Sequence, residues 1–333
     1  MWFNRAFFLT TELRNGTILR SYYTLFMHFL PEEPMIDSKL YSLLQVAELG
    51  SFTQAAKALS VTQPAVSQHI RALEEELGVR IFERQSGRLI VTRPGKEIIH
   101  TAKKIVALNR NLLQVLSDTK TMVTHLTVGM TPAAEASPIA EALAKYCADN
   151  DGVSIKILTD SVSNLYEKLK AYELDLAIVQ GREPDTGVRY QLLDTDCLVL
   201  AVPVNHPLAK RASVTLDDLK RERLILRLPG SATRALFVAH LESRSMSLND
   251  FNVVLEVDNM ATIKDLIRHD FGVSVLDRSV CLDELKSGSI AVVPIESLSI
   301  QHEINIACQE DFNRLDIVRD FIDTYTDTLK SYA

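Results

Sequence analysis

The sequence has few of the residues that build metal sites and disulfide scaffolds, and it has no long apolar run. Its four cysteines are far apart along 333 residues and match no zinc-ligand spacing; they are Cys147, Cys197, Cys281 and Cys308. We expect core thiols in a reducing cytosol, with a redox-sensing pair as the alternative. No stretch approaches the roughly 20 apolar residues of a membrane-spanning helix, so we predict a cytoplasmic protein without membrane contact.

Signatures of common enzymes are also absent. The eight histidines are scattered, and the chain has no HExxH segment, no glycine-rich phosphate loop and no Ser–His–Asp arrangement. Asp258 and Asp270 are conceivable as an acid pair, although solvated helix caps are the simpler interpretation. We therefore expect no enzymatic activity, no metal and no cofactor.

Charge is distributed unevenly along the chain. The net charge of −7 does not favour a nucleic-acid-binding protein, but residues 35–121 carry a net +4 and residues 122–333 a net −11. This division fits DNA contact by the N-terminal part alone, attached to an acidic body. A length of 333 residues also predicts two or three domains.

Residues 1–34 differ from the rest because they are aromatic-rich and irregular. Arg14 and Arg20 interrupt the apolar stretches, and no small-residue cleavage site follows, so the segment is a poor secretory signal. We expect residues 1–34 to be an extension that is either untranslated, with Met35 as the natural start, or poorly ordered.

Residues 51–78 have the pattern of two helices joined by a tight turn. Ser51 is the expected N-cap of a helix over 52–60, and Thr62 caps a second helix that has Pro64 in its first turn. Apolar residues at helical spacing give the second helix a buried face: Val66, Ile70, Leu73 and Leu77. The opposite face is polar. The pattern fits a helix-turn-helix that enters the major groove of DNA, and a plain helical hairpin with a solvated face is the alternative.

The segments that follow predict a two-stranded wing and a long helix. Residues 81–92 contain two strand-like apolar segments, 81–82 and 89–91, on either side of a turn at 85–87. Residues 96–121 repeat apolar residues every seven positions, beginning at Ile98. Such a seam needs a partner helix, so we expect dimerisation, with Asn109 either fixing the register or facing solvent.

Residues 39–95 closely resemble the DNA-binding domain of LysR-type transcriptional regulators. The matching residues are Gly50-Ser51-Phe52, Ala55-Ala56, Leu59, Gln63-Pro64-Ala65-Val66-Ser67, Ile70-Arg71, Leu73-Glu74, Leu77-Gly78, Phe82, Arg84, Thr92 and Gly95. The resemblance implies double-stranded promoter DNA as a partner, a second copy of the chain in a homodimer or homotetramer, and RNA polymerase as a further candidate. It also implies a fold that is α+β overall: a winged helix-turn-helix, a long linker helix and a two-lobed α/β domain like a periplasmic binding protein.

The same resemblance assigns DNA-binding residues to both helices and the wing. They are Thr53, Gln63, Pro64, Ser67, Gln68, Arg71, Arg84 and Arg88. Glutamine and serine suit base edges because both can donate and accept hydrogen bonds, whereas arginine suits guanine or phosphate. Arg84 has the alternative role of tying the wing to the helices.

From residue 123 onward, strand-like and helix-like segments alternate, which predicts parallel sheets covered by helices. The expected boundaries are 35–95 for the winged helix, 96–122 for the linker helix, 123–333 for the effector domain, 123–198 with 300–333 for lobe I, and 199–299 for lobe II. The chain crosses between the lobes near 197–202 and again near 297–303, and two crossings make a hinge.

Ligands of open α/β sheets bind beyond the carboxyl ends of the strands, which face the cleft in a two-lobed protein. This rule selects Thr131, Gln180, Ser231, Thr233, Asn259, Thr262 and Ser274 as effector-binding residues. The segment 229–234 is the most informative, because a glycine and two hydroxyls at a helix start can form an anion site. Helix capping without a ligand is the alternative.

Residues 229–234 and 256–267 resemble the branch of the family that regulates sulfur assimilation and carbon fixation. That branch commonly has a second glycine where this chain has Ala232. The resemblance implies a small-molecule effector that is an anion or a phosphorylated metabolite. The sequence thus predicts a transcription regulator. A solute-binding receptor of the same two-lobed shape is the alternative, and the helix-turn-helix counts against it.

Overall fold

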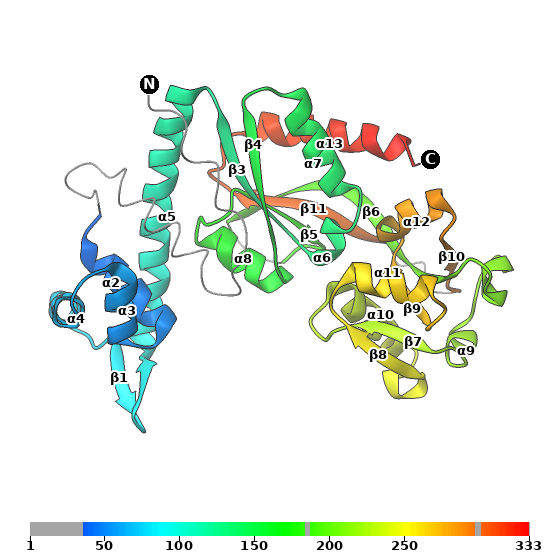
Figure 1. Ribbon diagram of the computed structural model, residues 1–333, viewed down its shortest axis with the longest axis horizontal. Coiled ribbons are helices and arrows are strands. Elements are labelled where there is room, and N and C mark those ends of the chain that lie inside the picture. The colour runs from blue at the N-terminus through cyan, green and yellow to red at the C-terminus, as the bar shows by residue number, and fades with distance from the viewer. Residues whose placement is uncertain (1–35, 184–186, 297–300, 333) are drawn as a thin grey trace. The chain divides into compact units, whose positions relative to one another are not determined.

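The computed structural model describes residues 36–183, 187–296 and 301–332 (Figure 1). The chain divides into two compact units, the first ending at Leu112 and the second beginning at Leu113. The predicted extension over 1–34 lies outside the described residues.

The first unit is a helix-turn-helix with a two-stranded wing, as predicted. Its elements are α2 (Ser38–Leu49), α3 (Phe52–Leu59), α4 (Gln63–Leu77), β1 (Phe82–Gln85), β2 (Arg88–Val91) and the first part of α5 (Arg93–Thr121). One apolar core, which includes Leu43, Val66 and Phe82, joins the helices to the wing. Leu77 is exposed, contrary to the prediction, because it is the last residue of α4 and the chain reverses at Gly78.

Helix α5 is continuous from Arg93 to Thr121 and contributes to both units. Ala102 is buried in the core of the first unit, whereas Asp118 accepts hydrogen bonds from the backbone and ring of His125 in the second. Between them, five apolar side chains are 44–51% exposed: Ile105, Leu108, Leu112, Val115 and Leu116. The segment predicted as a separate linker, 96–122, is therefore shared between the two units.

The second unit is built on two sheets that share one strand. Lobe I contains, in order, β4 (Val153–Thr159), β3 (Thr124–Met130), β5 (Leu176–Gln180), β11 (Gln301–Gln309) and β6 (Val188–Pro203). Lobe II contains β8 (Val253–Val257), β7 (Leu224–Arg227), β9 (Val273–Asp277), β6 again and β10 (Ile290–Pro294). The β3–β4, β3–β5, β7–β8 and β7–β9 pairs are parallel, as predicted, so the carboxyl ends of these strands share an edge in each lobe.

Helices cover both faces of these sheets. They are α6 (Pro132–Glu135), α7 (Ile139–Asp149), α8 (Val162–Lys170), α9 (Leu216–Leu219), α10 (Ala232–Ser243), α11 (Met260–Arg268), α12 (Leu282–Ser287) and α13 (Leu315–Lys330). In lobe I, Ile178 of β5 packs with α7 and α13, and the next residue, Val179, packs with α8 on the opposite face. Figure 1 shows α7 beside α13 on one side of the sheet and α8 on the other.

Strand β6 is much longer than the strand predicted over 197–202. Residues 188–197 pair with β11 in lobe I, and residues 198–203 pair with β9 and β10 in lobe II. The first half was not recognised because its side chains are mostly half-buried or exposed, which leaves no apolar run in the sequence. A single strand thus makes the first crossing between the lobes.

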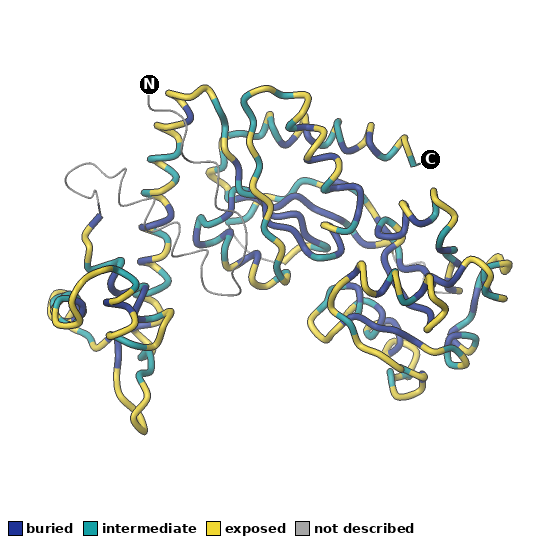
Figure 2. Tube along the Cα trace, viewed as in Figure 1, coloured by how far each residue is buried: buried dark blue, intermediate teal, exposed yellow. Residues whose placement is uncertain are grey.

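The buried residues lie along the strands and the helix faces that cover them (Figure 2). Cys281 and Cys308 are buried, Cys147 and Cys197 are half-buried, and all four are free thiols. Burial raises the pKa of each of these thiols, which keeps them protonated and unreactive. Within the described ranges, every helix is too short or too polar to cross a membrane.

Candidate functional site

The helix-turn-helix is held by the caps that the sequence predicts. The Ser51 hydroxyl accepts a hydrogen bond from the Gln54 amide at 3.3 Å, and the Thr62 hydroxyl accepts one from the Ala65 amide at 3.4 Å. Each cap satisfies a backbone donor that has no partner within its own helix. The caps fix where α3 and α4 begin, and therefore which side chains stand at the start of α4.

Glu74 fastens the wing to α4. Its carboxylate accepts hydrogen bonds from the amides of Ile81 at 2.8 Å and Phe82 at 3.2 Å, and it pairs with Arg80 at 3.0 Å. At the same base of the wing, after β2, Gly95 lies so close to the Ile81 carbonyl that a Cβ there would clash with that oxygen. The base of the wing is thus positioned by contacts to both of its strands.

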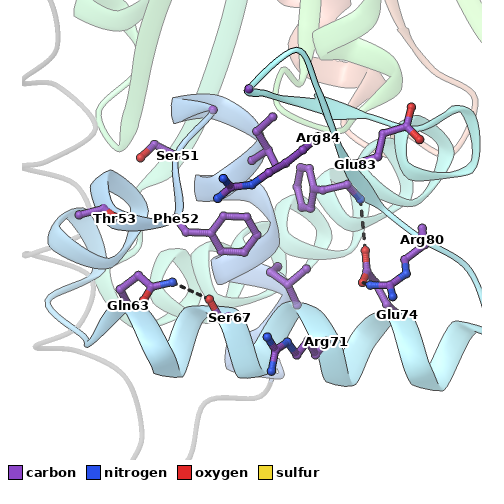
Figure 3. A pocket seen from close by; sticks show the side chains of 15 residues that line it. Ser51, Phe52, Thr53, Gln63, Ser67, Arg71, Glu74, Arg80, Glu83 and Arg84 are labelled. Atoms are coloured by element: carbon purple, nitrogen blue, oxygen red, sulfur yellow. Dashed lines mark hydrogen bonds and ion pairs between the residues drawn. The ribbon is translucent and has the colours of Figure 1, made fainter.

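A concave surface of about 540 Å³ lies between α3, α4 and the wing. Five of the eight predicted DNA-binding residues line it: Thr53, Gln63, Ser67, Arg71 and Arg84. Figure 3 shows Gln63, Ser67 and Arg71 along α4, with Arg84 reaching in from the wing. Residues from three separate segments therefore present hydrogen-bonding groups to one concave surface.

The Gln63 amide donates to the Ser67 hydroxyl at 2.8 Å, and this bond orients both groups one turn apart on α4. The other predicted DNA-binding residues are Pro64, Gln68 and Arg88; all three are exposed, and none lines the concave surface. Pro64 lies in the first turn of α4 and Arg88 begins β2, so both flank the surface.

A second pocket of about 460 Å³ lies between the lobes of the second unit. Its lining includes four predicted effector-binding residues: Thr131, Gln180, Ser231 and Thr233. Three helices begin at this pocket, because the N-caps of α6, α8 and α10 are the lining residues Thr131, Ser161 and Ser231. Helix N-termini favour negative charge, so their convergence gives the pocket an anion-attracting character.

Arg227 is the cation of this pocket. It is the last residue of β7 and is only 4% exposed. One terminal nitrogen donates to the Asp258 carboxylate at 3.2 Å, but the Nε atom is buried without a hydrogen-bond partner. Burial lowers the pKa of Arg227, with Asp258 and Asp277 opposing the change. The guanidinium remains charged and lines the pocket, so it adds a positive charge to the site.

Two acidic residues also line the pocket and limit its positive potential. Asp258 is the exposed partner of Arg227. Asp160 accepts hydrogen bonds from Lys168, Asn164 and the Ser161 amide. Although burial acts to raise it, these bonds keep the pKa of Asp160 below its usual value, so this carboxylate is charged at neutral pH.

The sequence-based selection missed Arg227, Asp160, Ser161 and Asp258. The signal was available, because Arg227 and Asp160 lie at the carboxyl ends of β7 and β4, where the strand-end rule applies. Ser161 follows Asp160 directly and is the N-cap of α8, which begins at Val162.

Three selected residues do not line the pocket. Asn259 caps α11, and its side chain accepts hydrogen bonds from the amide and hydroxyl of Thr262. Ser274 is the second residue of β9, so its placement at the carboxyl end of that strand is wrong. The carboxyl end of β9 is Asp277, which accepts a hydrogen bond from Thr233 at 2.6 Å.

A winged helix-turn-helix and a two-lobed domain with a pocket between its lobes define a DNA-binding protein that responds to a ligand. Two family models match the chain: "Bacterial regulatory helix-turn-helix protein, lysR family" over residues 38–96, and "LysR substrate binding domain" over residues 121–330. The chain belongs to the LysR family of transcriptional regulators. The alternative of a solute-binding receptor is therefore wrong for the chain as a whole.

Curated relatives include proteins named as transcriptional regulators. The chain is 29% identical over 271 residues to the transcriptional regulator CfxR of Cupriavidus necator, covering 81% of this chain and 84% of that protein. It is 26% identical over 279 residues to a probable RuBisCO transcriptional regulator of Trieres chinensis, covering 82% and 90%.

Solved structures share the fold over most of the chain. CbnR, a LysR family transcriptional regulator, has a TM-score of 0.63 at 18% identity, covering 87% of this chain and 98% of that one. Full-length OxyR from Pseudomonas aeruginosa has a TM-score of 0.61 at 23% identity, covering 88% and 95%.

Proposed function

We propose that this regulator reads promoter DNA through the concave surface of its first unit. Gln63, Ser67 and Arg71 would face base edges in the major groove, together with Pro64 and Gln68 nearby. The supporting observation is that α4 presents these side chains beside a wing held in place by Glu74. Thr53, Arg84 and Arg88 would contact phosphates, which positions the protein without reading sequence.

The regulator acts as a homodimer or homotetramer in this proposal. The exposed apolar side chains of α5 recur at spacings of three and four residues, from Ile105 through Leu108 and Leu112 to Val115. This is the spacing of a coiled-coil seam, which a second copy of the helix would cover. A structure of CbnR "complexed with the target DNA" is among the solved structures similar to this chain.

The effector in this proposal is a small anion, either inorganic or phosphorylated. The observation that carries this assignment is the Arg227 guanidinium in the lining of a pocket where α8 and α10 begin. Relatives named as RuBisCO regulators make a phosphorylated metabolite of carbon fixation a natural first candidate. In this proposal the three predicted segments have separate roles. DNA is bound by residues 35–95, the dimer is formed by residues 96–122, and the effector is bound by residues 123–333. No catalytic role is assigned, and RNA polymerase contact stays a prediction.

Selection of binding sites from random DNA with the full-length protein tests the first part of this proposal. We expect an enriched site with two related halves, because a dimer binds two half-sites. A thermal-shift series with sulfate, inorganic phosphate and sugar phosphates tests the second part. At least one anion should raise the melting temperature of the wild-type chain but not of Arg227→Gln, and the absence of any anion effect would contradict the assignment.

A further inference from the structure

Three buried ionisable side chains meet where the chain crosses between the lobes. Asp196 lies on β6, Asp277 ends β9, and His302 lies near the start of β11. Asp196 and His302 are directly opposite each other in the antiparallel β6–β11 pair. One nitrogen or oxygen from each residue lies within 4.8 Å of those from the other two. Within the described residues this is the one such cluster.

The charges of this cluster do not balance. Asp277 is 1% exposed and Asp196 is 7% exposed, and no lysine or arginine of the described chain forms an ion pair with either carboxylate. Two buried carboxylates therefore face a single imidazole. Buried charge is costly unless it is neutralised, so the cluster requires a further positive charge.

The unsatisfied atoms of the cluster indicate where this charge would lie. The His302 Nε2 atom is 3.1 Å from the Asp277 Oδ1 atom, but Oδ1 has no hydrogen-bond partner. The two atoms thus lie at ion-pair distance but outside hydrogen-bond geometry. Two ligand atoms that bind one ion lie side by side at this kind of separation, because bonds of about 2.0–2.2 Å at tetrahedral or octahedral angles place them about 3.0–3.5 Å apart.

We propose that Asp196, Asp277 and His302 form a binding site for one divalent transition-metal cation. Two carboxylates neutralise a divalent charge, and an imidazole with carboxylates is a ligand set suited to Zn²⁺ and Mn²⁺. The present separations of up to 4.8 Å would shorten to about 3.0–3.5 Å when the ion binds. The sequence predicted no metal because these residues are 196, 277 and 302 and share no motif.

The ion lies where the two lobes meet. It links β6, which runs through both lobes, and β11 of lobe I to the end of β9 in lobe II. The same cluster contacts two residues of the effector pocket: Thr233 donates to Asp277, and the Gln180 amide nitrogen lies 3.4 Å from the His302 Nε2 atom. Metal occupancy and effector binding are therefore coupled through these two side chains.

Titration of the full-length protein with Zn²⁺, after removal of any affinity tag and dialysis against EDTA, tests this site. We expect one Zn²⁺ per chain, and Co²⁺ in its place should give visible absorption bands. Asp277→Asn and His302→Gln should each weaken Zn²⁺ binding at least about 100-fold. His240→Gln is the matched control, because His240 is also buried in the second unit but lies outside the cluster.

Melting curves distinguish two sources of the further positive charge, namely a bound metal ion and a proton shared between the buried side chains. Zn²⁺ should raise the melting temperature of the wild type and of His240→Gln, but not of Asp277→Asn. An equal rise in all three places the ion elsewhere and overturns the proposal. Absence of stoichiometric Zn²⁺, with melting that follows pH alone, assigns the missing charge to a proton and also overturns it. Neither readout uses DNA or an anion, so the outcome is independent of the proposed function.

Discussion

The two candidate sites are built in different ways. The concave surface of the first unit comes from one continuous stretch, residues 50–89, in which caps and turns place each side chain. The pocket of the second unit takes its residues from five segments between Thr131 and Asp258, brought together only when both sheets have formed. A site of the first kind depends on local geometry, whereas one of the second kind depends on the packing of the whole domain.

The largest expected effect tests the local geometry of the first site. Glu74→Ala leaves the Ile81 and Phe82 amides and Arg80 without their acceptor, which should destabilise the first unit by about 2–4 kcal/mol. Chemical unfolding followed by circular dichroism measures this loss, and DNA affinity should fall with it. Glu75→Ala, on the same helix and exposed, is the control and should change neither. Equal stability of the two variants would show that the wing does not depend on Glu74.

The next effect tests the assembled pocket. Arg227→Gln removes the one lysine or arginine among the described residues that line the pocket. The substitution should weaken anion binding roughly 10- to 100-fold. Isothermal calorimetry with the anion found by thermal shift measures this change. Arg244→Gln is the control, because Arg244 is exposed at the C-terminal end of α10 and does not line the pocket. DNA affinity without the anion should be the same in both variants. If Arg227→Gln bound the anion normally, the pocket would not be the effector site.

A smaller effect separates base reading from fold in the first site. Gln63→Ala should weaken binding to the selected DNA site by about 1–3 kcal/mol while leaving non-specific affinity and unfolding unchanged. Fluorescence anisotropy with selected and scrambled duplexes measures both affinities. Gln54→Ala, an exposed glutamine on α3 outside the concave surface, is the matched control. Equal losses on the two duplexes would assign Gln63 to phosphate contact instead.

The smallest effect gives the sign of the ligand charge. Asp160→Asn removes a carboxylate from the pocket wall and should strengthen anion binding roughly 3- to 10-fold. The folded-state pKa of Asp160 is lowered, so its stabilising contribution is present above the usual value of 3.8 and is lost as pH falls through the lower folded value. Anion affinity should therefore show no titration of Asp160 at neutral pH. Asp149→Asn, at the far end of α7, is the control. Weaker binding in Asp160→Asn would indicate a cationic or donor-rich ligand.

The same contrast explains what the sequence could predict. Ser51, Thr62 and the polar face of α4 were found because caps and helical spacing act within a few residues of one another. Thr131, Gln180, Ser231 and Thr233 were found by applying one topological rule to predicted strands. Ser274 does not satisfy that rule, because it is the second residue of β9 and is buried in the core, whereas the carboxyl end of the strand is Asp277.

Some features had no local signal at all. The cluster of Asp196, Asp277 and His302 depends on the register of β11 against β6, and that register is set by tertiary pairing rather than by any nearby motif. The first half of β6 was missed for a related reason, since its pairing with β11 rather than its own composition makes it a strand.

Strand β6 is continuous through both lobes, so the alternation of its side chains in one lobe continues into the other. Side chains alternate between the faces of a strand with a period of two, and β6 is hydrogen-bonded into lobe I up to Cys197 and into lobe II from Leu198. The face of the sheet on which each β6 side chain lies in lobe I therefore determines on which face each of the following side chains lies in lobe II. One residue inserted between Cys197 and Leu198 would exchange the two covered faces of β6 in one lobe, so that Leu198 and Leu200 would leave the core they share with Phe237 for the core on the opposite face of the sheet. Two inserted residues would restore the alternation and shift only the spacing of the lobes.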